Sequence, residues 1–506
     1  MMTEILGRKF QYLGLCAQCC RKTFNIRLMI MTSLMSTTTR LEASRLLKKV
    51  FRDTPTRSRS ELNARPQSLF RVFIARGSRV FQQPARDPGT FSLTLHQDVS
   101  PVEAEWRELE TVGVATIYQS FDWVENWCRT AAPVRGEVPL IVAGRRADGS
   151  LAFVWPFAMT RRYGVKTLSW LGQSYDGYFL GVYGPDVMPL LTRPVMSSLL
   201  RDITRERPDL AALHLLRMPL TWQGQGNPFA RLTRQPFLPS YEMKLRKEFK
   251  ELYESCFSGL SRNKIARGDR KLAALGALID FATSPEERLA VYETFKQQKA
   301  VQLAAAGQGN VFEDTAIDAF FTAVFSCTEL RSFELDLSSL RVGPDIGATS
   351  IGARFKDRYY GMQTSLGDFE FKKLSPGFLL KRDAIARQCK CGASAFDLGP
   401  GAGWHKDSWH PSKLPRFATC IPLKPTGVLA TALSIADLRA RSAARSSRLV
   451  SKILGVAQSA SPAPSMALRH PSAQSPGSAS SRPQSIVKSR AHGASKSSPL
   501  ASVPSP

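Results

Sequence analysis

The sequence has 506 residues, of which 43% are hydrophobic, and a formal net charge of +27. This length exceeds one compact domain, and the apolar content excludes a chain without buried cores. Residues 1–90 and 411–506 each carry +12, whereas residues 91–410 carry only +3. The basicity therefore indicates solvated tails on a nearly neutral body, with an anionic partner such as nucleic acid or a lipid surface as the alternative.

Membrane and metal signals are weak. No run of about 18 apolar residues occurs, so we expect no membrane-spanning helix and a cytoplasmic protein. The nine cysteines follow no metal-ligand spacing. We therefore predict free thiols in a reducing compartment and no metal.

The two ends differ from the middle in composition. Residues 1–90 show no sustained hydrophobic period, which predicts a basic, disordered extension. Residues 426–456 read as a basic helix, a linker or alternatively a membrane-surface contact, and the Ser/Pro-rich residues 457–506 read as a disordered tail.

Residues 91–235 read as a first folded unit. A strand at 91–96 precedes two helices. We expect the first to begin at a capping box at Ser100 and the second to be capped by Ser120. Further strands are predicted at 138–144, 150–159, 166–171 and 211–218, with a linker at 221–227. In the loop at 172–178, Asp176 and Tyr178 are candidates for an acceptor site, although an Asx-type turn with a packed tyrosine explains them as well.

Residues 236–425 read as a second unit, which begins with a strand at 241–245. A helix at 260–275 carries a basic face, which suits either phosphate contact or solvent. A second capping box at Ser284 opens a helix to about residue 305, and a helix at 313–325 follows. We expect strands at 329–335, 339–342, 346–355, 358–364 and 416–423.

The stretch from Ser375 organises this second unit. Ser375 suits a helix cap and Pro376 the first helical position. The free N–H groups of Gly377 and its neighbour Phe378 predict a phosphate site at this helix start. After a left-handed stop at Gly392, a strand at 393–398 and a glycine loop deliver Asp397, His405, Lys406 and Trp409.

Several short motifs in this stretch resemble one acetyltransferase family. They are Tyr359-Tyr360-Gly361, Ser375-Pro376-Gly377, Phe396-Asp397-Leu398-Gly399, and Lys406 followed by Trp409. In order and spacing they resemble the CelD/BcsL acetyltransferases, named after cellulose biosynthesis. That family belongs to the GCN5-related N-acetyltransferase (GNAT) superfamily and is related to the Fem peptidyltransferases. His405 stands where the family usually shows a tyrosine.

The resemblance covers about 320 residues and implies an α/β fold with two GNAT-like mixed-sheet units side by side. It also implies transfer of an acyl group from acetyl-CoA to an amine or hydroxyl acceptor, in exopolysaccharide or envelope metabolism. GNAT chemistry needs positioning, carbonyl polarisation and removal of one proton, without a covalent intermediate.

Each candidate site residue receives a role in this chemistry. Asp397 is a base or an acceptor-orienting carboxylate, unless it only caps the glycine loop. Lys406 binds phosphate or stabilises negative charge, and His405 is a proton acceptor. Tyr359 and Tyr360 are donors to the oxyanion or the leaving thiolate, and Trp409 is assigned to substrate binding.

Two alternatives remain open at this point. A Fem-like transfer from aminoacyl-tRNA shares the fold and suits the basic ends. A non-catalytic binding module of a polysaccharide synthesis complex needs no chemistry. Release of thiol from acetyl-CoA distinguishes these three functions, because fold alone does not fix the reaction.

Overall fold

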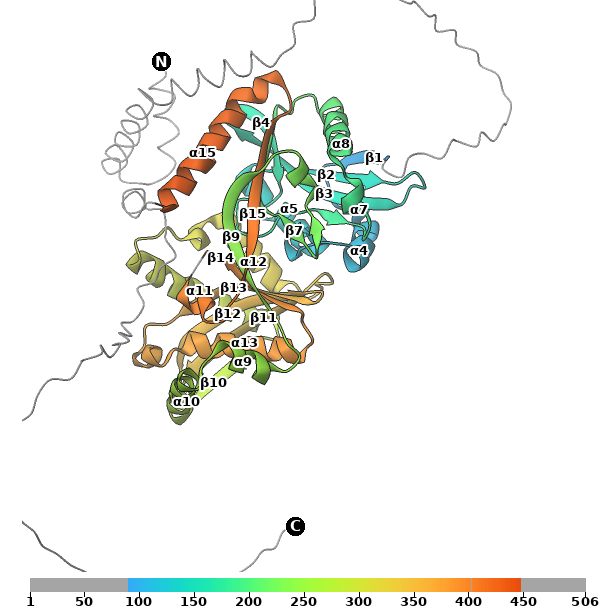
Figure 1. The fold of residues 1–506 in the computed structure, drawn as a ribbon. Coiled ribbons are helices and arrows are strands. Elements are labelled where there is room, and N and C mark those ends of the chain that lie inside the picture. Colours follow the sequence, from blue (N-terminus) through green and yellow to red (C-terminus); the bar gives the residue numbers. More distant parts are fainter. Residues whose placement is uncertain (1–89, 402, 447–506) are drawn as a thin grey trace, which may run out of the picture. The chain divides into compact units, whose positions relative to one another are not determined.

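The computed structural model describes residues 90–401 and 403–446, so the predicted N-terminal extension, apart from its last residue, and the Ser/Pro-rich tail lie outside the described residues. The described chain is a mixed α/β fold (Figure 1). Its principal helices are α4 (Glu103–Val112), α5 (Phe121–Arg129), α6 (Ala131–Arg135), α8 (Arg193–Glu206), α9 (Phe249–Cys256), α10 (Gly259–Ala274), α11 (Pro285–Ala305), α12 (Thr315–Ser326), α13 (Pro376–Lys390) and α15 (Val428–Ser446).

Within the described part of the chain, one 13-stranded sheet runs through both predicted units. In spatial order, with β5 (Val182–Tyr183) pairing β3 beside this path, its strands are β1 (Ser92–His96), β2 (Val138–Arg145), β3 (Leu151–Arg162), β4 (Val165–Trp170), β6 (Ala212–Pro219), β15 (Ser412–Pro422), β9 (Gln235–Lys244), β14 (Ala395–Pro400), β13 (Arg358–Leu366), β12 (Asp345–Phe355), β11 (Glu334–Val342) and β10 (Ala277–Phe281).

Strand β15 closes the sheet at its centre. It pairs antiparallel with β6 on one side and with β9 on the other, so a late segment joins strands of both predicted units (Figure 1). Among the described strands, hydrogen bonding is parallel only between β4 and β6 and between β13 and β14. The division near residue 235 therefore falls at the start of β9, inside one continuous sheet, and it stays a proposal.

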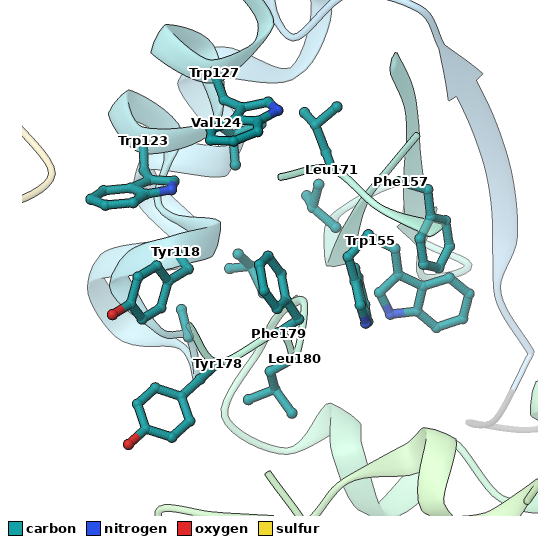
Figure 2. Packing of buried hydrophobic residues seen from close by; sticks show 14 of the residues in the cluster. Tyr118, Trp123, Val124, Trp127, Trp155, Phe157, Leu171, Tyr178, Phe179 and Leu180 are labelled. Carbon is teal, nitrogen blue, oxygen red and sulfur yellow. The ribbon is translucent and has the colours of Figure 1, made fainter. Parts of the chain in front are cut away.

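The largest apolar core also crosses that division. Trp123 of α5 packs edge-on against Phe320 of α12, with ring centroids 4.8 Å apart. The same core continues through Trp155 and Phe157 of β3 to Phe179 in the loop after β4, as Figure 2 shows. Such aromatic burial removes much apolar surface from water, so it holds the two halves together.

Two of the expected side-chain capping bonds are wrong. No side chain caps the turn at Ser100–Val102, because the Ser100 hydroxyl donates to Asp98 instead. Ser120 is the N-cap residue of α5 as expected, but its hydroxyl makes no capping bond and donates instead to the carbonyl of Ile117. Both hydroxyls donate hydrogen bonds to residues just before them in the chain, and such local bonds compete with helix capping.

Two strand predictions also differ from the structure. The strands expected at 329–335 and 339–342 are one strand, β11, because Ser338 and Ser339 continue the ladder with β12. The linker expected at 221–227 contains a small hairpin, β7 (Thr221–Trp222) with β8 (Gln225–Gly226).

Other local predictions are confirmed. Ser284 and Glu287 form the capping box that opens α11. Gly392 adopts the left-handed conformation after α13, with φ of 74°. None of the helices in residues 90–401 and 403–446 is long and apolar enough to cross a bilayer.

Candidate active site

The site begins where strands β13 and β14 separate. Their parallel pairing covers only three positions and ends at Tyr360 opposite Asp397. Beyond Tyr360, β13 continues to Leu366 paired with β12, while β14 continues against β9. A bulge at Met362 coincides with the separation, because Ile351 pairs with Gln363 and Gly352 with Gly361. We call the region between residues 361–366 and 398–400 the fork.

Asp397 lies at the apex of the fork and is 2% exposed. Its Oδ1 accepts hydrogen bonds from the Tyr178 hydroxyl at 2.9 Å and from the Gly399 N–H at 2.6 Å. Its Oδ2 has no hydrogen-bond partner among the described residues. Burial raises the pKa of Asp397, although the guanidinium of Arg358 acts in the opposite direction. A buried carboxylate with one free oxygen is suited to accept a proton.

Aromatic side chains line this apex. The ring of Tyr118 lies 6.1 Å from that of Tyr178 and 5.8 Å from that of Tyr360, centroid to centroid. Figure 2 shows the hydroxyls of Tyr118 and Tyr178 pointing away from the apolar cluster in the same direction. Burial, with the nearby charge of Asp397, raises the pKa of both phenols, so they are protonated donors at neutral pH. Sequence reasoning missed Tyr118, which lies outside every motif.

The two predicted tyrosines of β13 face opposite sides of the sheet. Tyr360 belongs to the large core that contains Tyr118, whereas Tyr359 packs on Phe396 in the core beneath α13. Alternation along a strand forces this result. The structure therefore brings Tyr360, but not the ring of Tyr359, to the side of Tyr118, and Tyr359 as a catalytic donor has no geometric support.

Asp176 is engaged in ion pairs. Its Oδ1 lies 3.1 Å from the guanidinium of Arg416 and 3.1 Å from that of Arg217. Burial alone would raise its pKa, but these cations lower the pKa of Asp176 below its usual value. Arg416 is 4% exposed and also donates to the carbonyl of Gly177. Asp176 thus fixes the loop that carries Tyr178, and its contact with substrate stays a prediction.

Lys406 lies on the β14 side of the fork, in the short helix α14 (Trp404–Asp407). It is 9% exposed, and its ammonium donates to the carbonyls of Pro400 at 2.7 Å and Gly401 at 3.1 Å. Burial lowers the pKa of Lys406 to about 8, against the pull of Asp397 and Asp176. His405 belongs to the same turn, but its side chain lies outside the described part of the structure.

Trp409 is a packing residue in this structure. It is 1% exposed and stacks on Phe378 at 5.8 Å, while Phe257 meets it edge-on at 4.9 Å. Its indole N–H has no partner among the described residues. Phe378 therefore joins α13 to Trp409, and the assignments of both residues to ligand binding stay predictions.

The start of α13 differs from the expected phosphate site. Ser375 is the N-cap residue but adopts the left-handed conformation, with φ of 61°, and its side chain makes no capping bond. The N–H groups of Phe378 and Leu379 donate to the carbonyl of Ser375. Pro376 has no N–H, so among the first four helical residues the N–H of Gly377 is the one without a hydrogen-bond partner in the described part of the chain. The backbone there offers one donor to a phosphate, fewer than expected.

Close packing against β13 explains why residue 377 is a glycine. A Cβ added there would lie 2.5 Å from Cδ2 of Leu366 on β13. The missing side chain therefore lets α13 approach β13 closely, rather than exposing backbone to a ligand. A bulky residue at 377 is consequently expected to disturb packing as well as any binding.

Asp397 lies in neither of two open grooves on the described part of the chain. One, of about 380 Å³, lies between α8 and the end of β15. The other, of about 370 Å³, is lined by Gln298 of α11 and by residues 366–369 at the open end of β13. The second groove is the nearer to the fork, since Leu366 belongs to both. Among the described residues no group of three or more His, Cys, Asp or Glu is arranged to hold a metal ion.

Comparisons with known proteins agree with a GNAT-type domain around the fork. Residues 260–407 match the family model described as "Acetyltransferase (GNAT) domain". This range includes α10 to α14 and both arms of the fork. No curated protein sequence matches the chain. The domain match supports acyl transfer as a general class, and the described fold is GNAT-like.

Solved structures show a distant likeness of the chain path. A structure titled "Crystal structure of FemX" has 11% identity and a TM-score of 0.48 over 67% of this chain and 100% of that one. L-PGS from Bacillus licheniformis has 11% identity and a TM-score of 0.41, over 68% and 97%. A tandem GNAT protein from the clavulanic acid biosynthesis pathway has 9% identity and a TM-score of 0.36, over 66% and 99%.

Proposed function

We propose that this protein transfers an acyl group, acetyl in the first place, from acyl-CoA to an amine or hydroxyl acceptor. As an extension of the CelD/BcsL resemblance, we place the acceptor in exopolysaccharide or envelope metabolism. The observation that carries the proposal is the buried Asp397 at the apex of the fork, with Oδ2 unpartnered. The family match over residues 260–407 supports the class of reaction.

The chain's own groups fit such a donor and acceptor. In this proposal Asp397 Oδ2 takes the proton that the attacking amine or hydroxyl loses as its new bond to the acyl carbon forms. The hydroxyl of Tyr178 donates a hydrogen bond to Oδ1, which leaves Oδ2 to accept this proton. The thioester supplies the acyl group, and the breaking C–S bond leaves a thiolate that finally takes up a proton. The ammonium of Lys406 stabilises the negative charge that develops during this step.

The burial of Asp397 sets its protonation. Because burial raises the pKa of Asp397, its carboxylate is a stronger base than a solvated aspartate. Its neighbours Tyr118 and Tyr178 remain protonated, which makes them donors rather than competing bases. These assignments divide the acid and base roles among groups whose environments push their pKa values apart.

The test is thiol release by the full chain from acetyl-CoA and longer acyl-CoAs, with amino sugars and simple amines as acceptors. Charged tRNA, assayed for aminoacyl transfer, forms a separate arm. Asp397→Asn should lower the rate about 10²–10⁴-fold, the usual contribution of a general base. Asp280→Asn, at an exposed residue of the edge strand β10, is the matched control and should retain the rate.

Two outcomes would contradict the proposal. One is transfer from charged tRNA with no thiol release from any acyl-CoA, which would establish the Fem-like alternative. The other is full activity in Asp397→Asn, which would remove Asp397 from the reaction.

A further inference from the structure

A pair of oppositely charged side chains crosses the sheet beside Asp397. Nη2 of Arg358 on β13 lies 2.7 Å from Oε2 of Glu242 on β9, and strand β14 runs between these two strands. Glu242 pairs with Asp397 in the register of β9 and β14, and Arg358 pairs with Ala395, two residues before Asp397. Paired residues project from the same side of a sheet, so the ion pair spans β14 on the face that carries Asp397.

Trp222 fixes the guanidinium in this position. The central carbon of the Arg358 guanidinium lies 4.5 Å from the centroid of the Trp222 ring, which is a cation–π contact. The indole is 3% exposed, donates to the carbonyl of Ala115 at 3.0 Å, and lies 5.3 Å from the ring of Tyr178, centroid to centroid. Tyr178 in turn donates to Oδ1 of Asp397. Two aromatic side chains from the first half of the chain thus hold both the arginine and the candidate base.

Two buried polar atoms remain without partners at this place. Nη1 of Arg358 is a donor and Oδ2 of Asp397 is an acceptor, and neither has a hydrogen-bond partner among the described residues. They do not bond each other either, since Glu242 is the carboxylate that pairs with Arg358 in the described chain. Burial raises the pKa of Asp397 and the guanidinium lowers it, which agrees with the neighbouring positions of the two groups. Buried charged groups left unsatisfied are costly, so the two atoms suit one shared ligand atom.

The exposed fractions indicate from which side a ligand reaches these atoms. The side chains of Glu242 and Arg358 are 20% and 16% exposed, whereas Asp397 is 2% exposed. Solvent therefore meets the ion pair first and the carboxylate of Asp397 behind it. A ligand that passes the ion pair brings its leading atom between Nη1 and Oδ2.

The shared atom must accept one hydrogen bond and donate another. A hydroxyl oxygen does both, because it has one O–H and two lone pairs. It accepts the Nη1–H of Arg358, gives its proton to Asp397, and keeps one lone pair for the acyl carbon. A neutral amine has a single lone pair, so a hydrogen bond from Arg358 would occupy the electrons that must attack. An ammonium would leave Nη1 unsatisfied and add a second cation beside it.

We propose that the acceptor of this protein is a hydroxyl group held between Arg358 and Asp397, and that the product is an ester. This inference rests on the proposed function, in which Asp397 is the base and an acyl-CoA is the donor. The hydroxyl oxygen forms its bond to the acyl carbon while its proton moves to Oδ2 of Asp397. The C–S bond breaks, and the leaving thiolate takes up a proton. Arg358 touches the acceptor and is thereby a further catalytic residue.

The test compares matched acceptors that differ only in the reacting atom. The full chain receives acetyl-CoA with methyl glucoside or the analogue in which an amine replaces its primary hydroxyl, and separately with cyclohexanol or cyclohexylamine. Thiol release, corrected for the reaction without protein, gives the rates. Mass spectrometry before and after alkaline hydroxylamine, which cleaves esters, identifies the products. The hydroxyl member should have the higher kcat/KM by about tenfold or more, at about pH 7 and at about pH 9, where more of the amine is neutral.

Arg358→Lys supplies the second measurement. Lysine keeps the charge that pairs with Glu242 but has no second nitrogen to donate to the acceptor. The variant should lower kcat/KM for the hydroxyl acceptor by about 10–100-fold, as for the loss of one hydrogen bond from a charged donor. Its preference for hydroxyl over amine should shrink as well, which a general loss of stability would not cause.

Arg354→Lys is the matched control. Arg354 pairs with Glu334 across neighbouring strands at a more exposed place, with 2.6 Å between Nη2 and Oε2. The same substitution there should change the rate less than about twofold.

The outcomes separate this inference from the proposed function. An amide as the main product, or an unchanged preference in Arg358→Lys, overturns the hydroxyl acceptor while the released thiol supports acyl transfer. Hydrolysis of acetyl-CoA without acylation of any acceptor also overturns it, because the place then takes only water. No thiol release from any acyl-CoA refutes the proposed function, and this inference with it. The products of the wild type decide the question even if Arg358→Lys fails to fold.

Discussion

The hydroxyl of Tyr178 donates a 2.9 Å hydrogen bond to Oδ1 of Asp397, although 219 residues separate them in the chain. Tyr178 comes from the loop after β4 and Asp397 from the end of β14. The candidate base is therefore held by both halves of the sheet, and Asp176 secures the same loop through Arg416. This relationship makes the first half a part of the candidate active site.

Tyr178→Phe should weaken this hold on Asp397. The hydrogen bond lowers the pKa of Asp397, so its loss should raise that pKa. The acid limb of the pH–rate profile should therefore move to higher pH, with a stability loss of about 1 kcal/mol. The exposed Tyr163, changed to Phe, is the control. An unmoved acid limb would show that Asp397 is not the titrating base.

Lys406→Ala should affect both rate and stability. Its ammonium satisfies two carbonyls of the glycine loop, so the variant should lose about 1 kcal/mol of stability. Loss of its charge should cost about 2–4 kcal/mol in kcat/KM. Lys406→Arg should recover little activity, because a planar guanidinium does not replace a compact ammonium in this buried position. Unchanged kinetics in Lys406→Ala, with melting curves recorded in parallel, would exclude Lys406 from the reaction.

The two serines that precede α13 and α11 should respond in opposite directions. Ser375 adopts φ of 61° without a capping bond, so Ser375→Gly should relieve strain and stabilise by about 0.5–1 kcal/mol. Ser284 makes a complete capping box, so Ser284→Ala should destabilise by about 1 kcal/mol. Urea denaturation of both variants measures the difference. A destabilised Ser375→Gly would mean that the serine side chain has a partner of its own.

Glu110 should make stability depend on pH. It is 4% exposed and accepts hydrogen bonds from Ser332 and from the N–H of Phe121. Burial raises the pKa of Glu110 to about 7, so the folded state favours the protonated form. The resulting stability is fully present below the unfolded pKa of about 4.5 and is lost as pH rises through about 7.

Glu110→Gln should remove this dependence. Between pH 4.5 and 7 the wild type should lose up to about 3 kcal/mol of unfolding free energy that the variant does not lose. Glu108→Gln, at an exposed position of the same helix, should follow the wild type. Denaturant titrations at several pH values give the comparison, and parallel curves for wild type and Glu110→Gln would refute the assignment.

Local sequence determined much of the fold around the site. The capping box at Ser284, the left-handed Gly392 and the hydrophobic periods of α10, α11 and α13 predicted those elements nearly at their observed bounds. These signals come from residues within one or two turns of each other, so the chain carries them without its tertiary contacts. The same holds for the motif that placed Asp397 and Lys406 near each other.

Tertiary structure decided which of these residues share an environment. Tyr359 and Tyr360 look alike in the sequence, but the sheet turns one toward α13 and the other toward Tyr118. The engagement of Asp176 by Arg416 depends on segments that only folding brings together. Burial and charge set pKa values and ion pairs through space, and the spacing of residues along the chain does not encode those distances.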